Sequence, residues 1–122
     1  MVTEAIATLK HALSGGVSPA MATPLIPGTY TVNLDVIPQL VDFLIGAGAK
    51  GLFVGGTTGE GILLDTDQRK ALHEAGIMAA AGRVPVLVHV GAQRTATAIE
   101  LAQHSVALGV DAIVAITPGS SV

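Results

Sequence analysis

The sequence contains no cysteine and no tryptophan, and it has very little charge. Without cysteine the chain can form no disulfide and offers no thiolate for catalysis, while the redox compartment stays undetermined. Aromatic residues make up 2% of the 122 residues and charged residues 12%. Half of the residues are hydrophobic, and most of these are alanine, valine, leucine and isoleucine, as expected for a sheet packed between helices.

Long apolar runs and clusters of basic residues are also missing. No stretch approaches the roughly 20 apolar residues that a membrane-spanning helix needs. The net charge is −3 and the six basic residues are scattered, which argues against nucleic acid or a membrane surface as a partner. Residues 3–13 carry charges, so they predict an amphipathic helix and not a signal peptide. We therefore expect a cytoplasmic protein.

The most informative stretch is residues 51–60, with the sequence GLFVGGTTGE. A short apolar run bounded by glycines is typical of a strand buried on both faces, and binding groups are expected in the turn after it. Glycines let a ligand approach the backbone, successive N–H groups attract anions, and the hydroxyls of Thr57 and Thr58 add donors. No lysine or arginine stands in this loop, so it suits a small carboxylate or a single phosphate. A turn that only reverses the chain fits the spacing equally well.

The remaining sequence predicts alternating strands and helices. Four strands are expected, near residues 17–23, 51–55, 84–90 and 112–117. Their alternation with helices implies a parallel sheet with right-handed crossovers. We expect one partial domain over residues 1–122, with an N-terminal helix in 1–16, the strands and their helices in 17–118, and a tail at 119–122.

Helix boundaries are indicated by capping residues. The first helix, over residues 3–14, should stop at Gly15-Gly16, and Asn33 should cap the second. Pro38 removes a backbone hydrogen bond, so the second helix must bend or begin later. Asp65-Thr-Asp-Gln68 has the spacing of a capping box, in which Gln68 reaches back to the cap residue. Arg94 or Thr95 opens the last helix.

Residues 55–60, GGTTGE, resemble the signature loop of the dihydrodipicolinate synthase / N-acetylneuraminate lyase family. Ala20-Met-Ala-Thr-Pro24 resembles the family's first strand, and residues 64–69 resemble the start of its second helix. Residues 85–91 and 111–118 resemble its third and fourth strands. The resemblance covers roughly residues 17–118.

The resemblance implies an α/β fold, the amino-terminal half of a (β/α)8 TIM barrel with about four βα units. It also implies a class I aldolase or lyase, acting on carbon–carbon or carbon–oxygen bonds. Such enzymes add or cleave pyruvate or another 2-keto acid through a lysine Schiff base, and no metal or organic cofactor takes part. By this resemblance Thr57 joins a hydroxyl proton relay, while Thr58, with Gly56 and neighbouring backbone, holds the pyruvate carboxylate.

The sequence also departs from the family. A complete barrel needs about 250 residues, and the family's Schiff-base lysine lies on a sixth strand, beyond Val122. Lys10, Lys50 and Lys70 are expected on helices or at a strand entry, so none replaces it. The family's relay tyrosine on strand five is missing too. A second relay tyrosine is absent because Thr117-Pro118 is followed by Gly119-Ser120, where the family usually has two tyrosines. We interpret Gly119-Ser-Ser-Val122 as foreign sequence after a truncation.

These departures predict that the chain alone is inactive. They also predict a homo-oligomer, or pairing with another half-barrel, since a half-barrel exposes two strand edges. Two alternatives are a non-catalytic α/β module that binds a small carboxylate, and a purely structural half-barrel.

Other candidate residues have competing interpretations. His89, at the end of the third strand, is a general acid or base or, more simply, a polar residue bonded to backbone. Glu60 is an acid/base candidate or a partner of nearby N–H groups, and Arg94 an anion contact or a surface residue. His11, His73 and His104 are expected on helix surfaces. No His/Asp/Glu spacing predicts a metal site.

Overall fold

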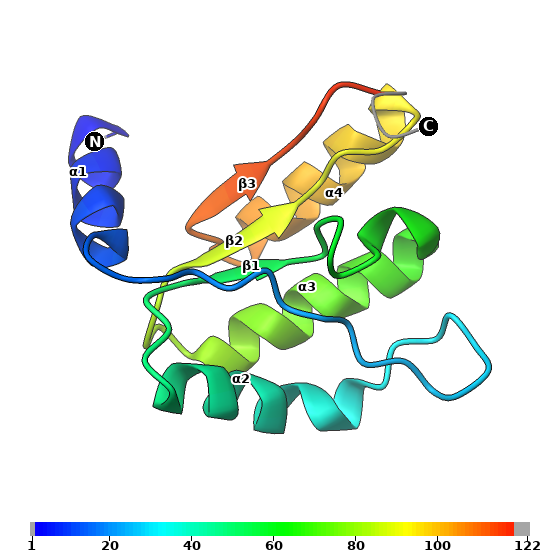
Figure 1. Cartoon of the computed structure of the whole chain (residues 1–122). Coiled ribbons are helices and arrows are strands. Elements are labelled where there is room, and N and C mark those ends of the chain that lie inside the picture. Colours follow the sequence, from blue (N-terminus) through cyan, green and yellow to red (C-terminus); the bar gives the residue numbers. More distant parts are fainter. Residues whose placement is uncertain (1, 119–122) are drawn as a thin grey trace.

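A parallel β-sheet with helices on its outer face forms the centre of the molecule, which is a computed structural model that describes residues 2–118 (Figure 1). The predicted tail at 119–122 lies outside the described residues. The helices are α1 (Val2–Leu13), α2 (Ile37–Gly46), α3 (Thr66–Ala80) and α4 (Thr95–Ala107), and the strands are β1 (Leu52–Val54), β2 (Val86–His89) and β3 (Ala112–Val114). Two short 3₁₀ helices, η1 (Leu34–Val36) and η2 (Gly61–Leu63), complete the elements.

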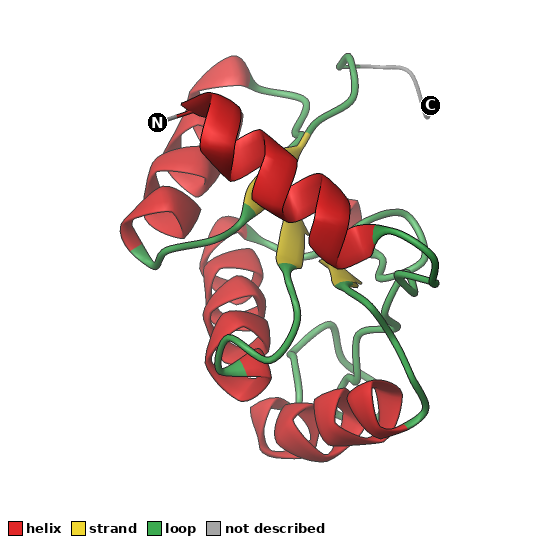
Figure 2. Cartoon of the chain, turned by 90° about the vertical axis from the view of Figure 1, so that its left-hand side faces the viewer, coloured by secondary structure: helices red, strands yellow, loops and turns green. Residues whose placement is uncertain are grey.

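The three strands lie side by side in the order β1-β2-β3, all parallel. Figure 2 looks along the strands and shows α2, α3 and α4 in an arc around one side of them, with α1 in front, across the strand ends. Leu52, Val54 and Val88 are fully buried in the core between strands and helices. The residues between them, such as Phe53 and Leu87, pair across the sheet and are half-buried on the opposite face. The sheet therefore has a packed outer face and a more open inner face.

The first predicted strand is the main difference from expectation. Residues 17–21 run parallel to β1, with Phe53 N donating to Pro19 O at 3.0 Å and Met21 N to Phe53 O at 2.9 Å. Within residues 17–23 a single isolated bridge is formed, between Ala20 and Phe53. Pro19 has no N–H to extend the ladder. The described residues thus contain three strands where four are predicted, and the predicted first strand is an extended segment with one bridge to β1.

Two capping predictions are also corrected. Asn33 forms no side-chain cap bond, and α2 begins at Ile37, with Pro38 in its first turn, where a missing N–H costs nothing. Asp65 does cap α3 by accepting from Gln68 N at 2.8 Å. The Gln68 side chain, however, does not reach back, because its Oε1 accepts from Val32 N at 2.7 Å. The Gln68 side chain therefore accepts from the N–H of Val32, which is distant in sequence, and not from the N–H of the cap residue Asp65.

The N-terminal helix lies apart from the core. It spans Val2–Leu13, close to the predicted 3–14, and none of its residues is buried. Among residues 2–118, no helix has the length and apolar character needed to cross a bilayer.

Candidate functional site

The loop after β1 is folded tightly on itself. Gly55 has φ +74°, and a side chain at Gly61 would meet the Gly55 carbonyl, since an ideal Cβ there lies 2.0 Å from its oxygen. Thr23 Oγ1 donates to Gly59 O and ties the loop to the segment after the bridged first strand. Glycine adopts the positive φ of Gly55 without strain, and at Gly61 the missing Cβ permits the close backbone contact. The glycines of GGTTGEG therefore shape the loop and leave its threonines free for other contacts.

Both predicted threonines are exposed on this loop, just beyond the carboxyl end of β1. A pocket of about 230 Å³ lies beside them and is lined by Gly56, Thr57, Glu60, Ile62, Leu63, His89 and Ile116. The structure thus brings Thr57, Gly56 and His89 together. Thr58 does not line this pocket, although it neighbours residues that do. The carboxyl ends of three strands, β1, β2 and β3, contribute to the pocket.

His89 is held by an arginine that the sequence analysis did not single out. Arg69 on α3 is 3% exposed, and its Nη1 donates to Gly91 O at 2.7 Å and its Nη2 to His89 O at 2.8 Å. The same Nη2 lies 3.3 Å from His89 Nδ1. Burial lowers the pKa of Arg69, and burial with the neighbouring Arg69 charge lowers that of His89. His89 is accordingly neutral near pH 7. The simpler interpretation predicted that its ring bonds to backbone, but the ring contacts the Arg69 side chain.

The prediction for His73 is wrong. It was expected on a helix surface, but it is fully buried, with Nδ1 3.4 Å from the hydroxyl of Ser105 on α4. Its Nε2 has no hydrogen-bond partner among the described residues and lies beneath the loop, 3.1 Å from where a Cβ of Gly55 would stand. Burial, followed by the Arg69 charge, lowers the pKa of His73 to about 3.

The helical spacing of α3 would have revealed both residues. Its buried positions are Arg69, Leu72, His73, Gly76 and Ala80, which recur at intervals of three and four. A polar residue within such a stripe faces the core, so the spacing predicts burial for Arg69 and His73.

The other candidates fall in different places. Arg94 is exposed at the start of α4 and does not line the Thr57 pocket, as expected of a surface arginine. Glu60 lines the pocket with φ +55°, and no hydrogen bond of its carboxylate is found among residues 2–118. His11 is exposed, as expected, whereas His104 is half-buried and its Nδ1 has no hydrogen-bond partner within residues 2–118.

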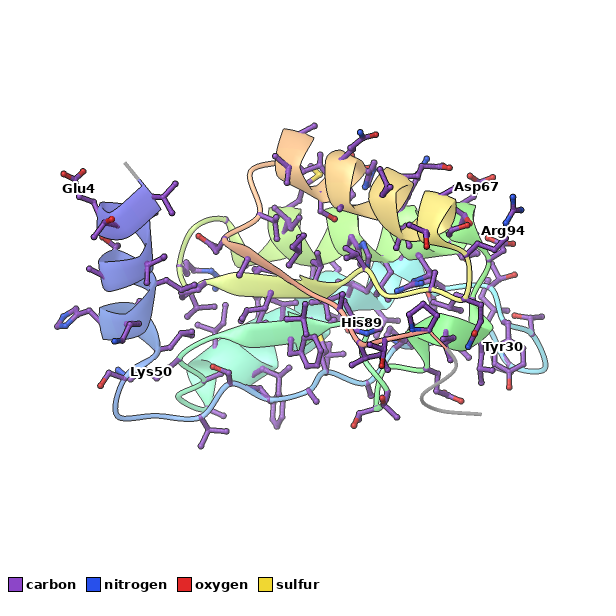
Figure 3. The ribbon with its side chains drawn as sticks, turned by 90° about the horizontal axis from the view of Figure 1, so that it is seen from above. Glu4, Tyr30, Lys50, Asp67, His89 and Arg94 are labelled. Carbon is purple, nitrogen blue, oxygen red and sulfur yellow. The ribbon has the colours of Figure 1, made fainter. Side chains whose placement is uncertain are left out.

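The lysines lie away from the pocket. Lys50 precedes β1 at its amino end, Lys10 is on α1, and Lys70 on α3 pairs with Glu100. Figure 3 shows Lys50 near α1, at the end of the molecule opposite Arg94, with His89 between them. The lysine positions agree with those expected from the sequence.

Comparison with known proteins decides the family. Residues 13–119 match the model of the dihydrodipicolinate synthetase family. The chain belongs to this family. It is 44% identical over 104 residues to 4-hydroxy-tetrahydrodipicolinate synthase 1 of Halalkalibacterium halodurans, covering 85% of this chain and 35% of that protein. It is also 44% identical over 105 residues to the probable 2-dehydro-3-deoxy-D-pentonate aldolase YjhH of Escherichia coli, covering 86% and 34%.

Solved structures of the dihydrodipicolinate synthetase family have the same fold as this chain over the part that it covers. YagE, a family member from E. coli solved in complex with pyruvate, superposes with a TM-score of 0.82 at 35% identity, covering 88% of this chain and 36% of that one. The predicted α/β fold, part of a (β/α)8 TIM barrel with parallel strands, is therefore confirmed, although the described residues form three strands and not four. The chain spans about a third of the length of the curated relatives it matches.

Proposed function

We propose that this chain carries the carboxylate-binding end of a lyase or synthase that acts on pyruvate or another 2-keto acid. The observation that carries the proposal is the pocket at the carboxyl ends of the strands, which Gly56 and Thr57 line together with His89. Barrel enzymes bind their substrates at this end of the strands. The names of the family relatives, a synthase and an aldolase, and the pyruvate bound to YagE support an enzymatic role over a non-catalytic binding module.

In this proposal the loop binds the acid group of the substrate. The Thr57 hydroxyl lines the pocket and can rotate to donate to a carboxylate or pass a proton. Gly56, buried under the Phe53 ring, has no side chain to block access to the backbone. Thr58 is exposed beside them, and we keep it as a proposed carboxylate contact. Arg69 adds a buried positive charge near the pocket, and its acceptors are two carbonyls and a neutral imidazole.

Calorimetric titration with pyruvate tests the binding site. We expect the unsubstituted chain to bind pyruvate and Thr57→Val, which keeps the side-chain shape without the hydroxyl, to bind it about tenfold more weakly, as for one lost hydrogen bond to a charged group. Thr95→Val, at the start of α4, is the matched control and should bind as the unsubstituted chain does. Equal affinity of Thr57→Val and the control would argue against the site.

The covalent step of the family needs a lysine amine, and we propose that this chain alone forms no Schiff base. Lys10, Lys50 and Lys70 are its lysines, and none of them lines the pocket. Treatment with pyruvate and borohydride should therefore leave the mass of the chain unchanged. A trapped pyruvyl-lysine adduct would refute this part of the proposal. A cytoplasmic location also stays a proposal.

A further inference from the structure

His89 is held so that one ring nitrogen faces the protein and the other is free. The ring stands edge-on to Phe53, with centroids 6.3 Å apart and planes at 73°. It also lies over Gly91, where a Cβ would come within 2.8 Å of Cε1 and 2.9 Å of Nε2. Nδ1 is turned toward Arg69, whereas Nε2 has no partner in residues 2–118 and is not among the atoms closed off from solvent. Since His89 lines the pocket, Nε2 is the ring nitrogen available to a ligand.

Arg69 decides which nitrogen carries the proton. A guanidinium has five N–H donors and no acceptor, and it does not deprotonate in proteins. Nη2 has two hydrogens, one for His89 O at 2.8 Å and one directed to Nδ1 at 3.3 Å. Nδ1 must therefore accept, which leaves the proton of the neutral ring on Nε2. Nη1, bonded to Gly91 O at 2.7 Å, fixes the guanidinium from the other side.

We propose that Arg69 locks His89 in the Nε2–H tautomer, and that this N–H is a fixed hydrogen-bond donor to an oxygen of the 2-keto acid held at Thr57. The inference rests on the function proposed above. Arg69 is a positioning residue, and His89 is a specificity-determining one that favours ligands with an acceptor oxygen. With Nδ1 occupied and Nε2 already protonated, His89 donates without taking up a proton, so it is not a general base. Neutral imidazoles act as fixed donors in other enzymes.

Nitrogen-15 NMR of the labelled full chain tests the tautomer without any ligand. Long-range correlations at pH 7 should show a neutral His89 ring with its proton on Nε2 only, assigned by the signal that His89→Gln removes. Arg69→Met should convert this to a mixture of the two tautomers. Arg94→Met, which removes an exposed arginine, should leave the His89 pattern unchanged. A proton on Nδ1, or a mixture of tautomers in the unsubstituted chain, would overturn the inference.

Pyruvate titration of two His89 variants tests the donor role. His89→Phe keeps a ring without a donor and should weaken binding about tenfold, whereas His89→Gln, which retains an N–H, should recover part of the loss. Pyruvate should also shift the Nε2 resonance of His89 more than those of His11 and His104. If His89→Phe bound as tightly as the unsubstituted chain, the donor role would be overturned while the proposed function stood. If the unsubstituted chain bound no pyruvate, the proposed function itself would fall, whatever the tautomer.

Discussion

At the residue scale, Gly61 is the loop position at which a side chain is tolerated least. An ideal Cβ there lies 2.0 Å from the Gly55 carbonyl oxygen, so any side chain forces two backbone segments apart. We expect Gly61→Ala to lower the free energy of unfolding by roughly 1–3 kcal/mol, as for an overpacked site. Gly46→Ala is the control, because a Cβ at Gly46, the last residue of α2, meets nothing within 4 Å. Urea unfolding of the two variants should show a loss only for Gly61→Ala.

His73 gives the fold a defined sensitivity to acid. Its pKa is about 3 in the folded chain against 6.5 unfolded, so between these values the unfolded state binds the extra proton. The stability that His73 contributes is complete above pH 6.5 and is lost as the pH falls toward 3. The slope from this one group reaches about 1.4 kcal/mol per pH unit.

A His73→Leu variant isolates this effect. The groups that act on His73, namely Arg69, His89 and His104, remain in the variant, so the difference in slope belongs to His73. Urea unfolding at pH 7, 6 and 5 should show a steeper loss of stability for the unsubstituted chain. Parallel pH profiles would contradict the lowered pKa of His73.

At the scale of elements, α3 links the functional loop to the sheet. Its amino-terminal turn carries Asp65 and Gln68, its inner stripe carries Arg69 and His73, and it packs on α2, α4 and the strands. Through Arg69 the helix holds both His89 and Gly91 at the end of β2. A shift of α3 along its axis would therefore move the His89 side of the pocket.

The two helix caps predicted from the sequence should differ in energy. Asp65 accepts from Gln68 N, so Asp65→Ala should cost about 1 kcal/mol of the free energy of unfolding. Asn33 forms no side-chain cap bond, and Asn33→Ala should stay within about 0.5 kcal/mol of the unsubstituted chain. Chemical denaturation of both variants checks this, and a larger loss for Asn33→Ala would contradict the caps described here.

At the scale of the whole molecule, one edge of the sheet is an unpaired strand among the described residues. β3 pairs with β2 on one edge and with no strand on the other among the described residues. Ile113 on β3 and Ile116 just after it are about half exposed, and so are Ile99 and Val106 on α4. An unpaired strand edge with exposed apolar residues favours association with another chain.

We therefore expect the chain to self-associate in solution. Ile113→Lys places a charge on β3 and should shift the population toward monomer, measured by light scattering across a range of concentrations. Ile6→Lys is the control, because Ile6 is similarly exposed at 54% but lies on helix α1 and not on the sheet. A monodisperse monomer of the unsubstituted chain would count against the prediction.

The sequence by itself determined the order of the elements and the nature of the loop. Apolar runs, glycines and the Asp65 cap are local signals, and the strands near 52, 86 and 112 and the helices between them were predicted from those signals. The GGTTGE pattern in register with the strands also pointed to the family, which the comparisons confirm. The roles of Thr57, Thr58 and Gly56 remain predictions.

The tertiary structure alone decided what the buried polar groups contact. Gln68 bonds to Val32, 36 residues away, and Arg69 to His89 and Gly91, so no local pattern specifies these partners. The burial of His73 depends on α4 supplying Ser105 and on the loop closing above it. Short-range preferences fix helices and turns, but the environment of a side chain is set by elements that meet only when the sheet and its helices pack.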